Sequence, residues 1–91
     1  MRQHSDSHAA IKRLKRIEGQ IRGIIKMVGD DKSCEDVLIQ IGSAKAALHK
    51  AGQVILENHL SHCLLDGIRE GKGEEAIERL LPAIEQFSRI V

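Results

Sequence analysis

Residues 34–66 read CEDVLIQIGSAKAALHKAGQVILENHLSHCLLD, with no proline and with Gly42 and Gly52 as the only weak helix breakers. Apolar and small side chains recur there at steps of three and four residues, which is the spacing of one face of an α-helix. The members of this face are Cys34, Val37, Ile41, Ala44, Leu48, Ala51 and Ile55. The stretch therefore predicts one long helix whose apolar seam packs against another helix.

The segment before the long helix also predicts a helix. Residues 7–28 place apolar side chains on one face and most of their basic side chains off it. The polar turn of residues 29–32 follows, and Ser33 is the expected N-cap of the long helix, with Asp36 at the position that its hydroxyl would contact. We expect the long helix to continue to Asp66 or Glu70.

The end of the chain predicts a third helix. Three glycines supply stop signals before it, namely Gly67, Gly71 and Gly73. The helix is expected to begin at Gly73 or Glu74 and to bury apolar residues up to Val91. Pro82 lies inside it, and the missing N–H and the ring predict a bend at residues 78–81. The predicted fold class is thus all-α, with three helices.

The length of the chain limits its own core. Ninety-one residues make one small domain, residues 1–91, whose hydrophobic core is marginal. A helical seam shared with a second copy would supply part of the stability, and we therefore expect an antiparallel dimer. The chain shows no signal peptide, transit peptide or long apolar run, so we expect a cytoplasmic protein.

Cys34, His59 and Cys63 form a candidate metal site. His59 and Cys63 are four residues apart, so they share one face of a helix and can bind one ion. Cys34 lies 25 residues earlier, which is roughly 37 Å along a continuous helix at about 1.5 Å per residue. It would therefore join the other two across an antiparallel dimer, which gives two sites related by two-fold symmetry.

The ligand types indicate which metal such a site would hold. Two thiolates and one imidazole favour a soft ion, with Cu(I) first, whereas zinc usually takes a fourth ligand. His62 is a candidate for that fourth ligand, although it points about one residue step away from His59 and Cys63. The alternative is structural: Cys34 and Cys63 would be small buried residues, with His59 as a hydrogen-bonded neighbour.

The charge distribution indicates where a polyanion would bind. Residues 1–28 hold seven basic and two acidic residues, a formal charge of +5, whereas the remainder carries −4. The basic residues off the apolar face include Lys12, Arg13, Lys15 and Arg16. Phe87 is the only aromatic residue, so base stacking of the kind used on single strands or RNA loops is not expected. A solvated basic face is the alternative.

The sequence also resembles a known family. The resemblance rests on residues 13–23 (RLKRIEGQIRG), residues 34–38 (CEDVL) with 40–41 (QI), and residues 57–63 (ENHLSHC), and it extends over about residues 10 to 90. These segments are similar to the CsoR/RcnR repressors. The resemblance implies an all-helical dimer that pairs into a tetramer, binds operator DNA without a helix-turn-helix, and releases it when the ligand binds.

The resemblance also implies roles for single residues. Cys34, His59 and Cys63 fall on the three Cu(I)-binding positions of the copper-sensing branch. Two basic residues, Arg13 and Lys50, fall on positions associated with operator binding. Two further positions depart from that branch, which tends to carry a tyrosine before the first cysteine and a glutamate on the third helix. In that branch these two positions are thought to couple the metal to DNA release, and this chain has Ser33 and Arg79 there.

We therefore expect a copper(I)-responsive repressor that controls copper-resistance genes. The alternatives within the family are a nickel or cobalt sensor, for which His4 and His8 are candidate N-terminal ligands, and a persulfide sensor, against which His59 argues. Formaldehyde sensors usually use an N-terminal proline, whereas the only proline here is Pro82. Outside the family, the alternative is a metal-buffering protein without DNA binding. An enzyme is not expected, because no nucleophile, base and acid are grouped in the sequence.

Overall fold

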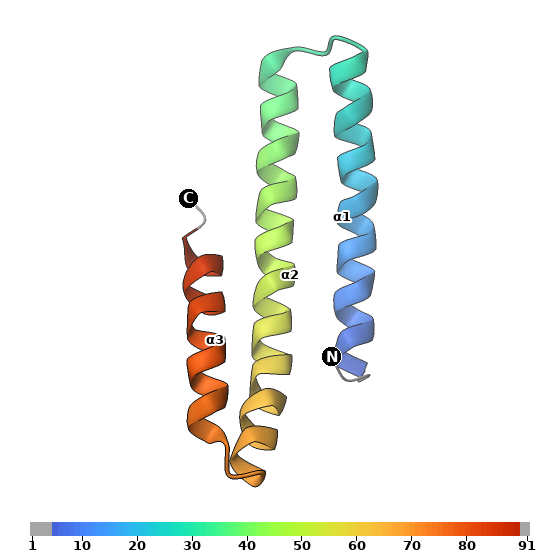
Figure 1. Cartoon of the computed structure of the whole chain (residues 1–91). Coiled ribbons are helices and arrows are strands. Elements are labelled where there is room, and N and C mark those ends of the chain that lie inside the picture. The colour runs from blue at the N-terminus through green and yellow to red at the C-terminus, as the bar shows by residue number, and fades with distance from the viewer. Residues whose placement is uncertain (1–4, 90–91) are drawn as a thin grey trace. The chain divides into compact units, whose positions relative to one another are not determined.

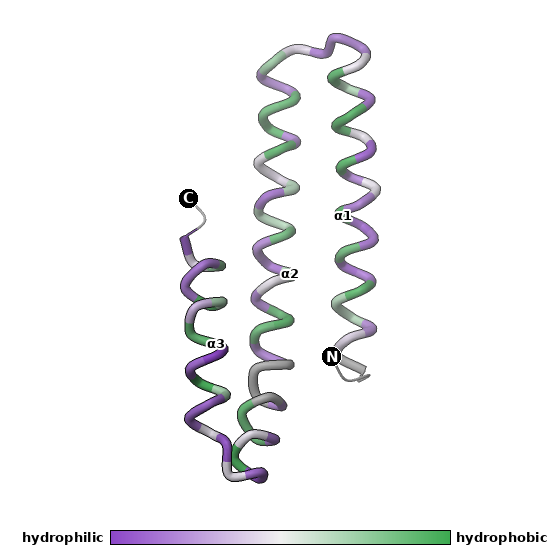
Figure 2. Tube along the Cα trace, in the orientation of Figure 1, coloured by the Kyte–Doolittle hydropathy of each residue, from purple (hydrophilic) through white to green (hydrophobic). Residues whose placement is uncertain are grey.

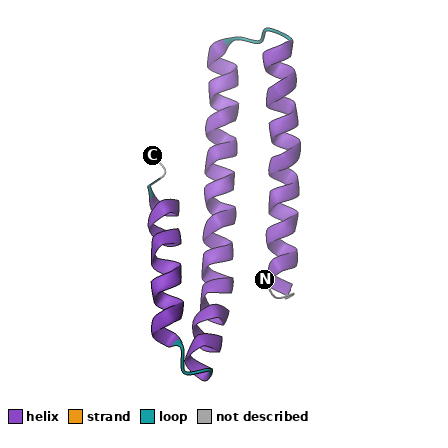
Figure 3. Ribbon diagram, viewed as in Figure 1, coloured by secondary structure: helices purple, strands orange, loops and turns teal. Residues whose placement is uncertain are grey.

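Three α-helices make up the fold of this chain. The computed structural model describes residues 5–89, and at residues 5, 6, 59–61 and 63 it describes the backbone alone. The helices are α1 (Ser5–Gly29), α2 (Cys34–Arg69) and α3 (Gly73–Ser88), as Figures 1 and 3 show. Residues 5–89 contain no strand, so the all-α prediction is confirmed.

The chain divides into two compact units within α2. The N-terminal unit is Met1–Val54 and holds α1 with the first part of α2, and the C-terminal unit is Ile55–Val91 and holds the rest of α2 with α3. In each unit, the two helical segments run antiparallel and side by side (Figure 1). A single domain over residues 1–91 stays a prediction.

The turn between α1 and α2 follows from backbone hydrogen bonds. Asp31 has a φ of 55°, and the N–H groups of Asp31 and Lys32 donate to Val28 O at 3.2 Å and Met27 O at 3.0 Å. This is a Schellman motif with an aspartate in the left-handed position. Ser33 then caps α2, because its hydroxyl accepts a 3.2 Å hydrogen bond from the Asp36 N–H. The predicted N-cap is confirmed.

The turn between α2 and α3 has the same geometry. Gly71 has a φ of 73°, and the N–H groups of Gly71 and Lys72 donate to Ile68 O at 3.0 Å and Gly67 O at 2.6 Å. Of the three glycines predicted as stop signals, Gly71 is therefore the one whose left-handed conformation ends α2. Gly67 remains inside α2 and Gly73 opens α3, so neither of them ends a helix.

Pro82 does not interrupt the third helix. It lies inside α3, which the structure assigns as one element from Gly73 to Ser88. The helix therefore does not restart at the proline, although the missing N–H removes one backbone hydrogen bond. The bend at residues 78–81 stays a prediction.

The packing of the N-terminal unit corrects the predicted seam of α2. Ala44 and Ala51, at 9% and 0% exposure, are buried in the protomer, whereas Ile41 and Leu48, at 43% and 51%, are exposed. Residues seven apart return to nearly the same face of a helix. The predicted seam therefore combined residues of two different faces of α2. One face, with Ala44 and Ala51, is buried inside the protomer, and the other, with Ile41 and Leu48, is exposed.

Most large apolar side chains lie on the surface of the protomer. Among the residues whose side chains the structure describes, the buried apolar ones are four alanines and Ile17, and no side chain of large volume is fully buried. Apolar residues recur along all three helices (Figure 2). The most exposed are Ile25, Leu38, Ile39 and Ile68, at 63–66% exposure. An apolar surface of this extent is typical of a chain that associates.

Candidate metal and DNA sites

The three predicted metal ligands all lie on α2. Cys34 is the first residue of that helix, and it is an exposed, free cysteine. His59 and Cys63 lie on the part of α2 that belongs to the C-terminal unit, four residues apart on a helical backbone. Their side chains are outside the described residues, so the ligand set stays a prediction that rests on donor chemistry and helix register.

Cys34 begins an outward-facing row on α2. The row consists of residues at steps of three and four whose side chains are all exposed: Cys34, Leu38, Ile41, Lys45 and Leu48. We call these five residues the α2 row. It is apolar apart from Lys45, and it belongs to a helix whose other face already packs on α1 through Ala44 and Ala51. The row is the surface on which a second helix would meet Cys34.

The further metal candidates fall in different environments. His62 is half-buried in α2 and already takes part in an interaction within the chain. His8 is exposed on α1. His4 lies outside the described residues, so its predicted role is not addressed by the structure.

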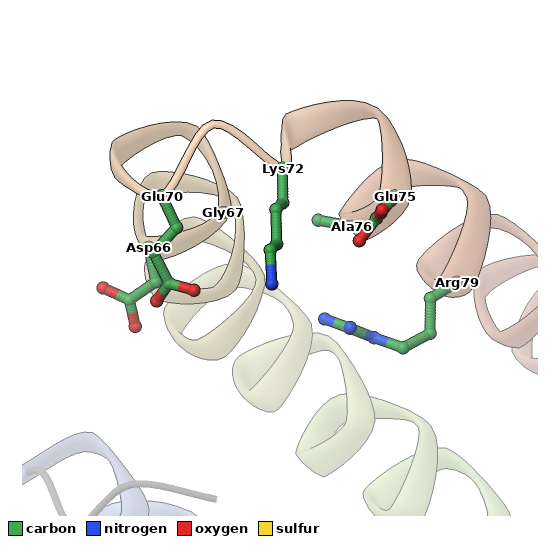
Figure 4. A pocket seen from close by; sticks show the side chains of 7 residues that line it. All are labelled: Asp66, Gly67, Glu70, Lys72, Glu75, Ala76 and Arg79. Carbon is green, nitrogen blue, oxygen red and sulfur yellow. The ribbon is translucent and has the colours of Figure 1, made fainter.

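The two positions that depart from the copper-sensing pattern have defined roles of their own. The Ser33 hydroxyl serves as the N-cap of α2 and is exposed. Arg79 is exposed on α3 and lines a cavity of about 200 Å³ with Asp66, Glu70 and Lys72. Lys72 and Arg79 extend toward each other, and the carboxylates of Asp66 and Glu70 lie on the α2 side of that cavity (Figure 4).

A basic surface is assembled by the register of α1 against α2. The Gln20 Nε2 group donates a 3.0 Å hydrogen bond to the Ser43 hydroxyl, which fixes the two helices at one level. Seven residues before Gln20 is Arg13, and seven after Ser43 is Lys50. Two helical turns along antiparallel helices therefore bring Arg13 and Lys50 to one level on the same side.

The other basic candidates extend this surface along α1. Lys12, Lys15 and Arg16 are exposed, as are Arg13 and Lys50. Two ion pairs made by residues of α1 involve other cations: Arg22 with Glu18 at 3.8 Å and Lys26 with Asp30 at 3.6 Å. We call the five residues the basic face: Lys12, Arg13, Lys15, Arg16 and Lys50. Its cations are available to phosphates.

The C-terminal unit has the opposite charge. Residues 55–91 contain four basic and seven acidic residues. The C-terminal unit is therefore expected to repel a polyanion, whereas the basic face attracts one. Sequence reasoning did not find the Gln20–Ser43 hydrogen bond. No local pattern signals this bond, because its two residues are 23 positions apart in the sequence.

Comparison with known proteins decides the family. The model of the metal-sensitive transcriptional repressor family matches residues 6–86. This chain belongs to that family. The copper-sensing transcriptional repressor CsoR of Bacillus subtilis is 47% identical over 77 residues, which are 85% of this chain and 76% of that protein. The copper-sensing repressor RicR of Mycobacterium tuberculosis is 43% identical over 98% of this chain and 90% of its own length.

Two solved structures are similar to the fold. The copper-sensing repressor CsoR with Cu(I) from Geobacillus thermodenitrificans has a TM-score of 0.88 and 45% identity, and the match covers 98% of this chain and 93% of that one. The nickel-responsive transcriptional regulator InrS has a TM-score of 0.75 and 34% identity over 96% and 97% of the two chains. In the described residues of this family member, no helix is long and apolar enough to cross a membrane.

Proposed function

We propose that this chain is a Cu(I)-responsive transcriptional repressor that binds operator DNA without copper and releases it when Cu(I) binds. Family membership supports the repressor role. The copper-sensing relatives from two genera and the soft donor set of Cys34, His59 and Cys63 support the choice of metal. When bound, Cu(I) supplies a thiolate-rich link between helices of two chains. It adds no catalytic step, and we infer no enzymatic activity.

The α2 row is the observation that carries the proposal. Cys34 begins an exposed apolar row that no segment of the same unit covers, and a row of this kind needs a partner helix. A second copy running antiparallel would place Cys34 of one protomer level with His59 and Cys63 of the other. The two-fold axis then passes near Leu48, which is 51% exposed in the protomer. Each dimer would hold two sites, and two dimers would form the tetramer.

The basic face supplies the DNA contact in this proposal. Arg13 and Lys50 come from different helices, so their joint placement depends on the relative position of α1 and α2. A metal at the dimer seam that shifts α2 would therefore move the two cations relative to the phosphates. Most of the specificity would come from DNA shape, since no recognition helix is evident in α1. Operator DNA also implies a cytoplasmic location.

The decisive experiment is a fluorescence-anisotropy titration of duplex DNA selected from a random library on the apo protein. One equivalent of Cu(I) per protomer should weaken binding by about 10- to 100-fold, within the usual range of allosteric coupling. Equal affinity with and without Cu(I) would leave a metal-buffering protein and reject the sensor. X-ray absorption of the reduced Cu(I) complex should show sulfur ligands.

The shared site has a separate test. Cys34→Ala protein and Cys63→Ala protein should each lose tight Cu(I) binding, and mixing them should restore one intact site per heterodimer. His59→Ala should weaken binding less, because both thiolates remain, and His62→Ala should have the smallest effect. A verified heterodimer without copper binding would show that the ligands come from one chain.

A nickel-responsive repressor is the second candidate, because the nickel-responsive InrS shares the fold at 34% identity. His4 and His62 are the residues that would extend the ligand set toward nickel. Titration of the DNA complex with Ni(II) and with Cu(I) in parallel distinguishes the two, since the effector is the ion that releases DNA at the lower free concentration.

A further inference from the structure

Positions 59, 63 and 67 fall on one face of α2. They are four residues apart on a helix that is continuous from Cys34 to Arg69. Gly67 therefore lies one turn beyond the proposed ligand Cys63 on the face that would carry the metal. The C-terminal unit contains all three positions together with α3.

At Gly67, α3 approaches α2 closely. A Cβ atom at Gly67 would lie 3.0 Å from the Ala76 Cβ and 3.3 Å from the Lys72 carbonyl oxygen. Real Cβ atoms rarely come this close to a neighbour, so a side chain there would push α3 outward. By contrast, a Cβ at Gly42, on the same helix, would meet nothing within 4 Å.

Ala76 is the buried residue of α3. It is 3% exposed, whereas the large apolar residues Ile77 and Leu81 of the same helix are 47% and 50% exposed. The contact is flanked by the polar cavity that Asp66, Glu70 and Arg79 line (Figure 4). The described contact between α2 and α3 at this point therefore joins two small residues beside a polar cavity.

We propose that the Gly67–Ala76 contact is the pivot through which α3 responds to metal on α2, and that Gly67 is a positioning residue for the repressor. The inference rests on the proposed function, because it concerns the same metal face. It also accounts for Arg79, which stands where copper sensors of this family tend to carry a glutamate. In this chain the coupling passes through close packing at Gly67, and Arg79 lines the cavity beside it.

The test compares Gly67→Ala with the matched variant Gly42→Ala in the Cu(I)-dependent DNA titration. On addition of Cu(I), the DNA affinity of wild type and of Gly42→Ala should fall about tenfold or more. The DNA affinity of Gly67→Ala should fall by only about twofold or less. Cu(I) affinity, measured by chelator competition, should stay within about threefold in both variants, which separates coupling from metal binding. Adding Ala76→Gly to Gly67→Ala removes the Ala76 Cβ, the nearer of the two close atoms, and should restore most of the coupling.

Wild-type coupling in Gly67→Ala, or no recovery in the double variant, would overturn the pivot. Hydrogen exchange of the wild-type protein tests it without any substitution: Cu(I) should change the exchange rates of the α3 amides at residues 73–88. Unchanged rates would overturn the pivot even if Gly67→Ala failed to fold. Absence of any Cu(I) effect on DNA binding in wild type would instead reject the proposed function.

Discussion

The two units of this chain use small residues in different ways. In the N-terminal unit, α1 and α2 meet over Ala10, Ala44 and Ala51, and ten basic residues outnumber six acidic ones. In the C-terminal unit, α2 and α3 meet at Gly67 and Ala76, and acidic residues outnumber basic ones. Both contacts leave large apolar side chains outside. We therefore expect both units to pack against other copies of the chain. We expect only the N-terminal unit, which has the excess of basic residues, to bind DNA.

Leu48→Glu should have the largest effect, because it tests whether the exposed apolar residues of α2 form a dimer interface. The proposed two-fold axis passes near Leu48, so two unpaired carboxylates would face each other in an apolar seam, at a cost of about 3 kcal/mol or more. We expect a monomeric, less helical protein without tight Cu(I) binding, measured by analytical ultracentrifugation and circular dichroism. Gln40→Glu adds the same charge at an exposed position outside the α2 row and should remain assembled. A dimeric Leu48→Glu protein would place the seam elsewhere.

Ala51→Leu tests the inner row of α2. Ala51 is 0% exposed, so three added carbons have no space and should lower the free energy of unfolding by about 1–3 kcal/mol. Ala46→Leu makes the same change at an exposed position of the same helix and should alter it by about 0.5 kcal/mol or less. Thermal unfolding measures both. Equal effects would mean that α1 does not pack over Ala51 in solution.

Arg13→Ala and Lys50→Ala test the charge difference between the units. Each should lower the slope of log affinity for DNA against log salt by about 0.9, because one fewer phosphate is neutralised. Arg69→Ala, in the acidic unit, should leave the slope unchanged. Cu(I) affinity should be nearly unchanged in all three variants. A loss of both affinities in Arg13→Ala would give that residue a role in the fold.

The two helix-ending turns give the smallest expected effects. Gly71→Ala puts a Cβ at a φ of 73° and should lower the free energy of unfolding by about 1 kcal/mol. Asp31→Gly relieves the same conformation at a φ of 55° and should raise it by about 0.5 kcal/mol, since the greater freedom of the unfolded chain offsets part of the gain. Denaturant unfolding measures both. A more stable Gly71→Ala protein, or a less stable Asp31→Gly protein, would mean that the turns differ in solution.

The sequence by itself determined the helices and most of their ends. Periodicity and the absence of proline predict α2, and Ser33 predicts its cap, because these signals act between residues within a few positions of one another. The family and the candidate ligand positions could also be predicted, since residue type and spacing carry them. Local signals did not predict that Asp31 takes the left-handed position in the turn before α2.

Only the tertiary structure decided which face of α2 meets which neighbour. Periodicity shows that a helix has an apolar face. However, α2 carries apolar residues on more than one side, so spacing alone could not separate buried Ala44 and Ala51 from exposed Ile41 and Leu48. The level of Arg13 with Lys50 and the close approach at Gly67 likewise depend on contacts between residues far apart in sequence. Such contacts follow from how side-chain volumes pack between helices, which no local pattern encodes.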